Sequence, residues 1–124
     1  MSQEGIKVMV VEDEILIGLM LAKNLRSSGY IVREVATTGE EAIERAGLEQ
    51  PEVIMMDVTL AGDINGIEAA RQIKAEHGTP IIIFSGYSDK SFYEQVQQVD
   101  PVAVLSKMGP FSDITAAIEK AVGR

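Results

Sequence analysis

The stretch VMVVEDE, residues 8–14, places four apolar residues directly before three carboxylates. A short apolar run bounded by polar residues is typical of a strand that is buried on both faces of a sheet. Glu12, Asp13 and Glu14 would then follow the carboxyl end of that strand. Like charges so close together repel, so we expect a cation, a shared proton or the solvated start of a helix beside them.

The composition predicts one domain, residues 1–124, with a substantial core. The chain has 124 residues, of which 46% are hydrophobic, and its net charge is −8. Nucleic acids and anionic membranes would repel that charge, so neither is expected as a partner. The sequence has no apolar run of about 18 residues and no signal-peptide pattern, which favours the cytoplasm. Without cysteine and with one histidine, it lacks the means for disulfides, thiol chemistry or a histidine-based transition-metal site.

Strand-like and helical patterns alternate along the chain. The apolar runs occupy residues 6–11, 30–35, 53–57, 80–85 and 102–106. Thr38 and Glu41 form a capping box that opens a helix to about residue 46, and a second helix is expected from residue 66 to about 76. The last helix carries an apolar stripe of Ile114, Ile118 and Val122. This alternation predicts the α/β class, with a doubly wound, five-stranded parallel sheet and five helices on its two faces.

Polar side chains stand where four of these strands end. Glu12 and Asp13 follow the first strand, and Asp57, Ser85 and Lys107 stand at the ends of the third, fourth and fifth. In open parallel sheets, ligands bind beyond the carboxyl ends of the strands, so these groups should converge. Carboxylates suit Mg²⁺, and an aspartate can attack a phosphoryl group whose charge a metal and a lysine would neutralise.

These residues, in this order, resemble the receiver domains of two-component response regulators, from Lys7 to about Val122. The resemblance implies a flavodoxin-like strand order of 2-1-3-4-5. In this resemblance, Glu12 and Asp13 match the acidic pair, and Asp57 matches the phosphoacceptor. Thr59 stands where the family supplies a backbone carbonyl to the metal. Ser85 matches the hydroxyl that contacts the phosphoryl group, and Lys107 matches the lysine.

The resemblance also implies a function. Asp57 would accept a phosphoryl group, with Mg²⁺, from a sensor histidine kinase or a histidine phosphotransfer protein. The chain would be a non-enzymatic, stand-alone receiver that signals to a downstream protein by a conformational change. Its segment PIIIFSGYSD, residues 80–89, is similar to a subfamily with a Phe-Ala-Thr-Gly-aromatic motif, often associated with HWE-type sensor kinases.

Three departures from the family pattern affect the expected switch. Val104 stands where the family has an aromatic residue, so Tyr87 is the expected substitute partner of Ser85. The usual Lys-Pro step is Lys107-Met108, for which we expect a trans peptide bond. The loop after Asp57 lacks the common proline and is one residue longer than usual.

Other functions remain alternatives. A phosphatase of the haloacid dehalogenase type would need a second acid at Thr59, and a flavin carrier would need a loop of Ser, Thr and Gly where the acids stand. A degenerate receiver that serves only as a protein-interaction module stays open until phosphorylation is tested.

The helix expected after the acids, ILIGLMLAKNLRSSG, residues 15–29, has more apolar residues than one buried face needs. The spacing assigns Ile17, Met20, Leu21 and Leu25 to the core. A second stripe would face outward beside the acids: Ile15, Leu19 and Ala22. In the family, this helix is where the helical bundle of the kinase or phosphotransfer protein docks.

Overall fold

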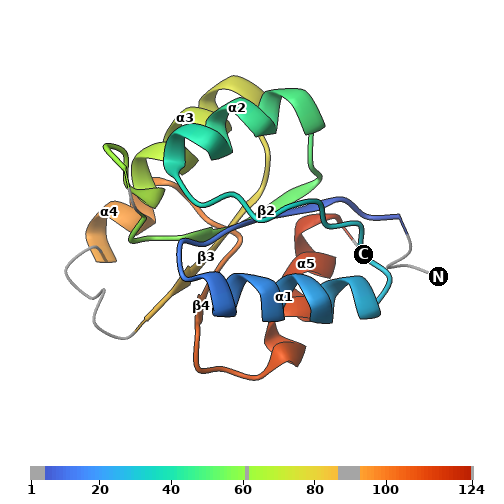
Figure 1. The fold of residues 1–124 in the computed structure, drawn as a ribbon. Helices are drawn as coiled ribbons and strands as arrows, with labels where there is room; N and C mark the ends of the chain where they lie inside the picture. Colours follow the sequence, from blue (N-terminus) through green and yellow to red (C-terminus); the bar gives the residue numbers. More distant parts are fainter. Residues whose placement is uncertain (1–4, 61, 87–92, 124) are drawn as a thin grey trace.

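A computed structural model describes residues 5–60, 62–86 and 93–123 of the chain. Its sheet has four parallel strands in the order β1-β2-β3-β4, with β2 and β3 in the middle (Figure 1). The strands are β1 (Val8–Val11), β2 (Val53–Asp57), β3 (Ile81–Ser85) and β4 (Ala103–Ser106). All residues of β1 and β2 are buried, which explains why their sequences are continuous apolar runs rather than alternating ones.

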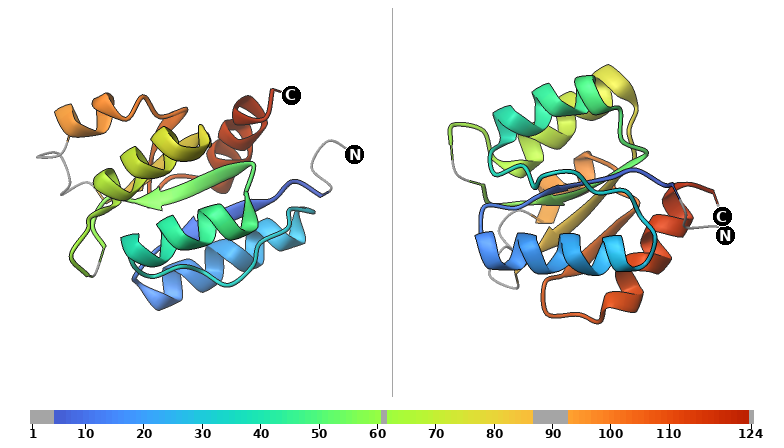
Figure 2. Two further views of the ribbon diagram at one scale, coloured as in Figure 1. Left: turned by 90° about the horizontal axis from the view of Figure 1, so that it is seen from above. Right: turned by 45° about the vertical axis from the view of Figure 1, so that its right-hand side comes forward.

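Within the described residues, five helices cover the two faces of this sheet. They are α1 (Ile15–Ser27), α2 (Gly39–Glu49), α3 (Gly66–His77), α4 (Tyr93–Gln98) and α5 (Phe111–Ala121). Helices α2 and α3 lie side by side on one face, and α1 and α5 lie on the other (Figures 1 and 2). Each face has its own hydrophobic cluster. None of the described helices is long and apolar enough to cross a membrane.

The second of the five expected strands is an irregular edge segment. Residues 30–36 run alongside β1, but among them only Ile31 and Ala36 form bridges, which are isolated, parallel and made with Lys7 and Val11. Between the two bridges, β1 advances by four residues and the edge segment by five. One extra residue on one side breaks a β-ladder, as in a bulge. The described chain therefore forms four regular strands and not five, although the segment runs beside β1 as the expected order requires.

Two arginines hold the edge segment in place of a ladder. Arg26 of α1 donates from Nε to the carbonyl of Val32 at 2.9 Å and from Nη2 to that of Arg33 at 3.1 Å. Arg45 of α2 donates to the carbonyl of Glu34. These side chains satisfy backbone carbonyls that a regular edge strand would leave open to another chain.

The expected helix starts are confirmed, with one change in detail. The Thr38 hydroxyl accepts from the backbone N–H of Glu41 at 3.1 Å and caps α2. The Glu41 carboxylate does not return to Thr38, as a full capping box requires, but accepts from the backbone N–H of Thr37 at 2.9 Å. The Asn65 side chain caps α3 by accepting from the backbone N–H of Glu68 at 2.9 Å.

Helix α1 buries most of the expected face, with Ile17 packed against the core, but Met20 and Ala22 lie on the opposite sides from those expected. Leu21 and Leu25 are in the core, but Met20 is 65% exposed, and Ala22, expected to face outward, is buried. Small residues explain the difference: a Cβ on Gly18 would lie 3.0 Å from Cγ1 of Val35, so the helix packs closely along Gly18 and Ala22. The larger side chains beside this line turn outward, and Ile15, Leu16 and Leu19 are exposed.

Gly66 brings the start of α3 against the end of β2. Its backbone N–H donates to the carbonyl of Val58 at 2.8 Å, and a Cβ at this position would lie 1.7 Å from the carbonyl oxygen of Asp57. Only glycine fits so close to another backbone. The loop that follows Asp57, residues 58–65, is therefore closed at its base.

Candidate functional site

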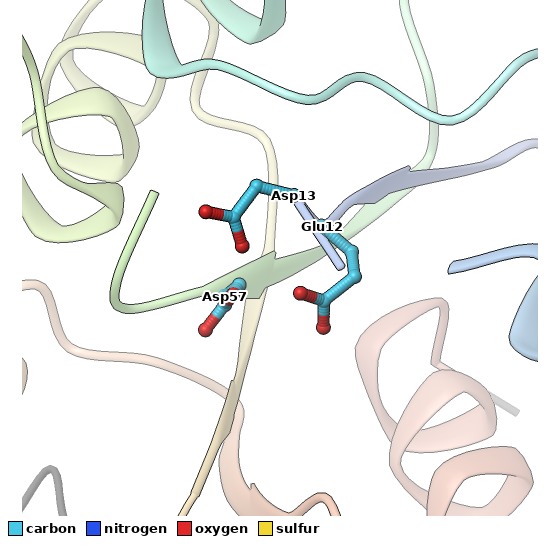
Figure 3. Close-up of side chains that lie close together, drawn as sticks. All are labelled: Glu12, Asp13 and Asp57. Carbon is cyan, nitrogen blue, oxygen red and sulfur yellow. The ribbon is translucent and has the colours of Figure 1, made fainter. Parts of the chain in front are cut away.

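Three carboxylates meet at the carboxyl ends of neighbouring strands (Figure 3). Glu12 and Asp13 follow β1, and Asp57 is the last residue of β2. One oxygen from each carboxylate lies within 4.8 Å of the other two. Glu12 and Asp57 are each only 1% exposed, and Asp13 is half-buried. The parallel register of β1 and β2 places the three groups together, as expected for residues at the carboxyl ends of neighbouring parallel strands.

Lys107, the residue after β4, reaches this cluster. Its Nζ lies 3.1 Å from Oδ2 of Asp57, and it donates to Oε2 of Glu12 at 3.3 Å. Oε1 of Glu12 is closer, at 3.0 Å, but it lies off the hydrogen-bonding direction and has no hydrogen-bond partner among the described residues. The third partner of Nζ is Oε1 of Glu14, at 3.1 Å. The sequence signalled Glu14 only as one of three consecutive acids, and its contact with Lys107 was not expected.

The carboxylates of the site outnumber the single ammonium of Lys107, and the pKa values of Asp57 and Lys107 are shifted as a result. Burial raises the pKa of the Asp57 carboxyl to about 8, and the hydrogen bond with Glu12 and its charge act in the same direction. Lys107 opposes this rise without cancelling it. Burial alone would lower the pKa of Lys107, but its hydrogen bond with Glu12 and the charge of Asp57 raise it above its ordinary value.

Asp13 supplies the remaining donor. Within the described residues, its carboxylate forms neither a hydrogen bond nor an ion pair, and it stands beside the carboxylates of Glu12 and Asp57 (Figure 3). Three carboxylate oxygens that lie within 4.8 Å of one another, with the Lys107 ammonium unable to neutralise them all, are the kind of donor set that a hard divalent cation prefers. Glu12, Asp13 and Asp57 could therefore hold Mg²⁺, which would also favour the ionised form of Asp57.

The other expected site residues lie around Asp57. The backbone N–H of Thr59 donates to Oδ1 of Asp57 at 3.3 Å. Ser85 ends β3 on the same rim, beside Phe84, which pairs with Asp57, and its carbonyl accepts from the backbone N–H of Lys107 at 2.9 Å. Tyr87 lies outside the described residues.

Two of the three departures from the family pattern lie on and after β4. Val104, at the position of the usual aromatic, is 44% exposed on β4. The Lys107-Met108 bond is trans, as expected, because the described residues contain no cis peptide bond.

The fold and the site define an α/β domain that presents a buried aspartate, two further acids and a lysine at the carboxyl edge of a parallel sheet. A model of the family described as "Response regulator receiver domain" matches residues 8–119. The chain belongs to this family, and it is a non-enzymatic signalling module of two-component systems.

Known proteins of this kind are similar over nearly the whole chain. The transcriptional regulatory protein PdtaR from Mycobacterium tuberculosis is 36% identical over 118 residues, which cover 95% of this chain but 57% of that protein. The chain thus spans little more than half of this curated relative. The signal receiver domain of a modulated diguanylate cyclase from Desulfovibrio desulfuricans G20 is 31% identical, with a TM-score of 0.89 and coverage of 94% and 93%.

A third similar structure bears on the metal. The receiver domain of sensor histidine kinase PA1611 from Pseudomonas aeruginosa PAO1 is 26% identical, with a TM-score of 0.86 and coverage of 97% and 99%. It is described with a magnesium ion coordinated in its active-site cleft.

The raised pKa of Asp57 predicts a pH dependence of stability in metal-free protein. Between its ordinary value of 3.8 and about 8, the folded chain keeps a proton that the unfolded chain has released. The folded state therefore binds more protons, and the free energy of unfolding should fall as the pH rises through this window. Asp57→Asn should remove this part of the slope. Urea unfolding of both proteins from pH 4 to pH 9 in a chelator measures it, and parallel profiles would contradict the burial of an easily protonated Asp57.

Proposed function

We propose that Asp57 accepts a phosphoryl group from a sensor histidine kinase or a histidine phosphotransfer protein, and that the chain signals by the conformational change that follows. The observation that carries the proposal is the contact of buried Asp57 with Lys107 at 3.1 Å, beside two further acids at the strand ends. A carboxylate that meets a lysine and a cation site can act as a phosphoryl acceptor.

The transfer needs one bond to form and one to break. A carboxylate oxygen of Asp57 attacks phosphorus, the bond from phosphorus to the donor's histidine nitrogen breaks, and that nitrogen keeps the electron pair and takes a proton. Bound Mg²⁺ would neutralise charge on the carboxylates and the phosphoryl oxygens. Lys107 is close enough to Asp57 to stabilise a phosphoryl oxygen.

We assign the remaining roles from the resemblance and from position. Glu12 and Asp13, with Asp57 and the backbone carbonyl of Thr59, would hold Mg²⁺. Ser85, on the same rim, would donate to a phosphoryl oxygen and act with Tyr87 as the switch. The magnesium in the PA1611 receiver supports the choice of ion.

We propose the exposed side of α1 as the surface for the phosphodonor. Leu16, Leu19 and Met20 are 77%, 56% and 65% exposed, so none of the described segments covers them. A hollow beside α1 is lined by apolar residues of α1 and α5 and reaches Lys107. A helical bundle packed over α1 would bury this apolar surface and place a phosphohistidine near Asp57.

The finer assignments stay proposals. The resemblance of residues 80–89 to the Phe-Ala-Thr-Gly-aromatic subfamily makes an HWE-type kinase the proposed donor, and the proposed location is the cytoplasm. The downstream partner is a protein that distinguishes the phosphorylated chain from the unmodified one.

Magnesium should stabilise the folded protein, because it binds a carboxylate cluster that only folding assembles. At a concentration one hundredfold above Kd, the gain is about 2.7 kcal/mol. Thermal unfolding with and without millimolar Mg²⁺ measures the shift of the midpoint, and Asp13→Asn should reduce it. An unchanged midpoint, or an equal shift in the variant, would count against the site.

Phosphorylation by a small donor tests the chemistry directly. With acetyl phosphate and Mg²⁺, the chain should gain the mass of one phosphoryl group by mass spectrometry, and Asp57→Asn should gain none. Lys107→Ala should react about tenfold more slowly or worse, because a charge-assisted contact is lost. A modified Asp57→Asn protein would refute the assignment, and an unmodified wild type would favour the interaction module without phosphorylation.

Leu19→Glu tests the docking surface. Since Leu19 is exposed, the variant should fold and accept a phosphoryl group from acetyl phosphate normally. Transfer from the cognate kinase should slow by about tenfold or more, because an apolar contact is replaced by a buried charge. Leu48→Glu is the matched control, because Leu48 is 77% exposed on α2, across the sheet from α1. Equal losses with both donors would show that Leu19 does not act in docking.

A further inference from the structure

Helix α2 contacts the loop that follows Asp57. The carboxylate of Glu40, in the first turn of α2, accepts from the backbone N–H of Asp63 at 3.2 Å through Oε2. Its Oε1 lies against Gly62, where an added Cβ would be 2.9 Å away. Beside it, a Cβ on Gly39 would lie 2.9 Å from the carbonyl oxygen of Ile64. The far part of the loop therefore rests directly on the N-terminal turn of α2.

The near part of the same loop belongs to the site. The backbone N–H of Thr59 donates to Oδ1 of Asp57, and the carbonyl of Thr59 is the proposed metal ligand. The base of the loop is closed by the hydrogen bond between Gly66 and Val58. With the base fixed, the placement of residues 62–65 depends on what holds the far side of the loop, where Glu40 contacts Asp63.

Glu40 does not cap its own helix. The Thr38 hydroxyl accepts the N–H of Glu41, and the Glu41 carboxylate turns back to Thr37. An acid in the first turn is favourable near any helix N-terminus, but that attraction requires no particular direction. The Glu40 carboxylate is directed at the backbone of a segment 23 residues further along the chain. The Glu40 side chain is therefore oriented to bind the loop and not to cap α2.

We propose that Glu40 is a positioning residue for the Mg²⁺ site. By holding Asp63, it fixes residues 62–65 against α2 and so helps to keep the backbone of Thr59 at Asp57. Without this contact, the loop must be ordered when the cation binds, and the cost of ordering lowers the affinity. This inference rests on the proposed function of the Asp57 site.

Two substitutions at Glu40 separate the hydrogen bond from the charge. Glu40→Gln keeps the length of the side chain and an oxygen acceptor but removes the charge, whereas Glu40→Asp keeps the charge but is too short to reach Asp63. Glu44→Gln is the matched control for charge, because Glu44 is exposed on the same helix and has no partner among the described residues. All variants are made in the full chain.

Isothermal titration with MgCl₂ measures the affinity, and amide hydrogen exchange in metal-free protein measures the protection of Asp63. Glu40→Asp should weaken Mg²⁺ binding by about fivefold, as expected for one hydrogen bond, and speed exchange at Asp63. Glu40→Gln and Glu44→Gln should both stay near wild type. Because Glu40 is exposed, the metal-free melting point should change little in any variant.

The inference is overturned if Glu40→Asp binds Mg²⁺ as the wild type does. It is also overturned if Glu40→Gln and Glu44→Gln lose affinity equally while Glu40→Asp keeps it, because charge alone would then be responsible. A wild-type chain that does not bind Mg²⁺ would instead refute the proposed metal site itself.

Discussion

The structure depends on one buried cluster of charge, in which Lys107 faces the carboxylates of Glu12 and Asp57. Burying ions costs on the order of several kcal/mol for each of them, and a single ammonium does not neutralise three carboxylates when Asp13 is included. Each acid is fixed at or directly beyond the end of a buried strand, so the cluster cannot relax by moving into water. The excess negative charge can therefore be relieved only by a bound proton or cation. The pKa of Asp57, raised to about 8, reflects the favourable binding of a proton.

The same imbalance makes the site responsive to ligands. A cation or a phosphoryl group bound at the site gives the folded protein a second state, with a different charge at the strand ends. Lys107 connects these strand ends, because it follows β4 and contacts residues after β1 and at the end of β2. Its three carboxylate partners include exposed Glu14, at the start of α1. A phosphoryl group on Asp57 would compete with Glu14 for this ammonium. The charge change would thus be transmitted to α1 and β4 together.

Much of this could be predicted from the sequence, because buried parallel strands are written as continuous apolar runs and the residues that end them must share one edge. That rule located Glu12, Asp13, Asp57 and Lys107. It could not reveal the irregular path of residues 30–36, which depends on one extra residue and on arginines from two helices. Nor could it place Met20 and Ala22 on the correct sides of α1, where the close approach of Gly18 to Val35 decides which small residues are buried.

Several of the contacts that escaped prediction are hydrogen bonds between a helix side chain and a backbone group far away in the sequence. Glu40 and Arg45 both act this way, and both come from α2. Such contacts leave no periodic signal, because a single polar residue on an exposed helix face looks the same whether it is solvated or bonded. Yet they hold the two irregular segments that flank the acids, residues 30–36 and 62–65. Helix α2 therefore does more than cover the sheet: it anchors, from one side, the parts of the chain that the strands leave unpaired.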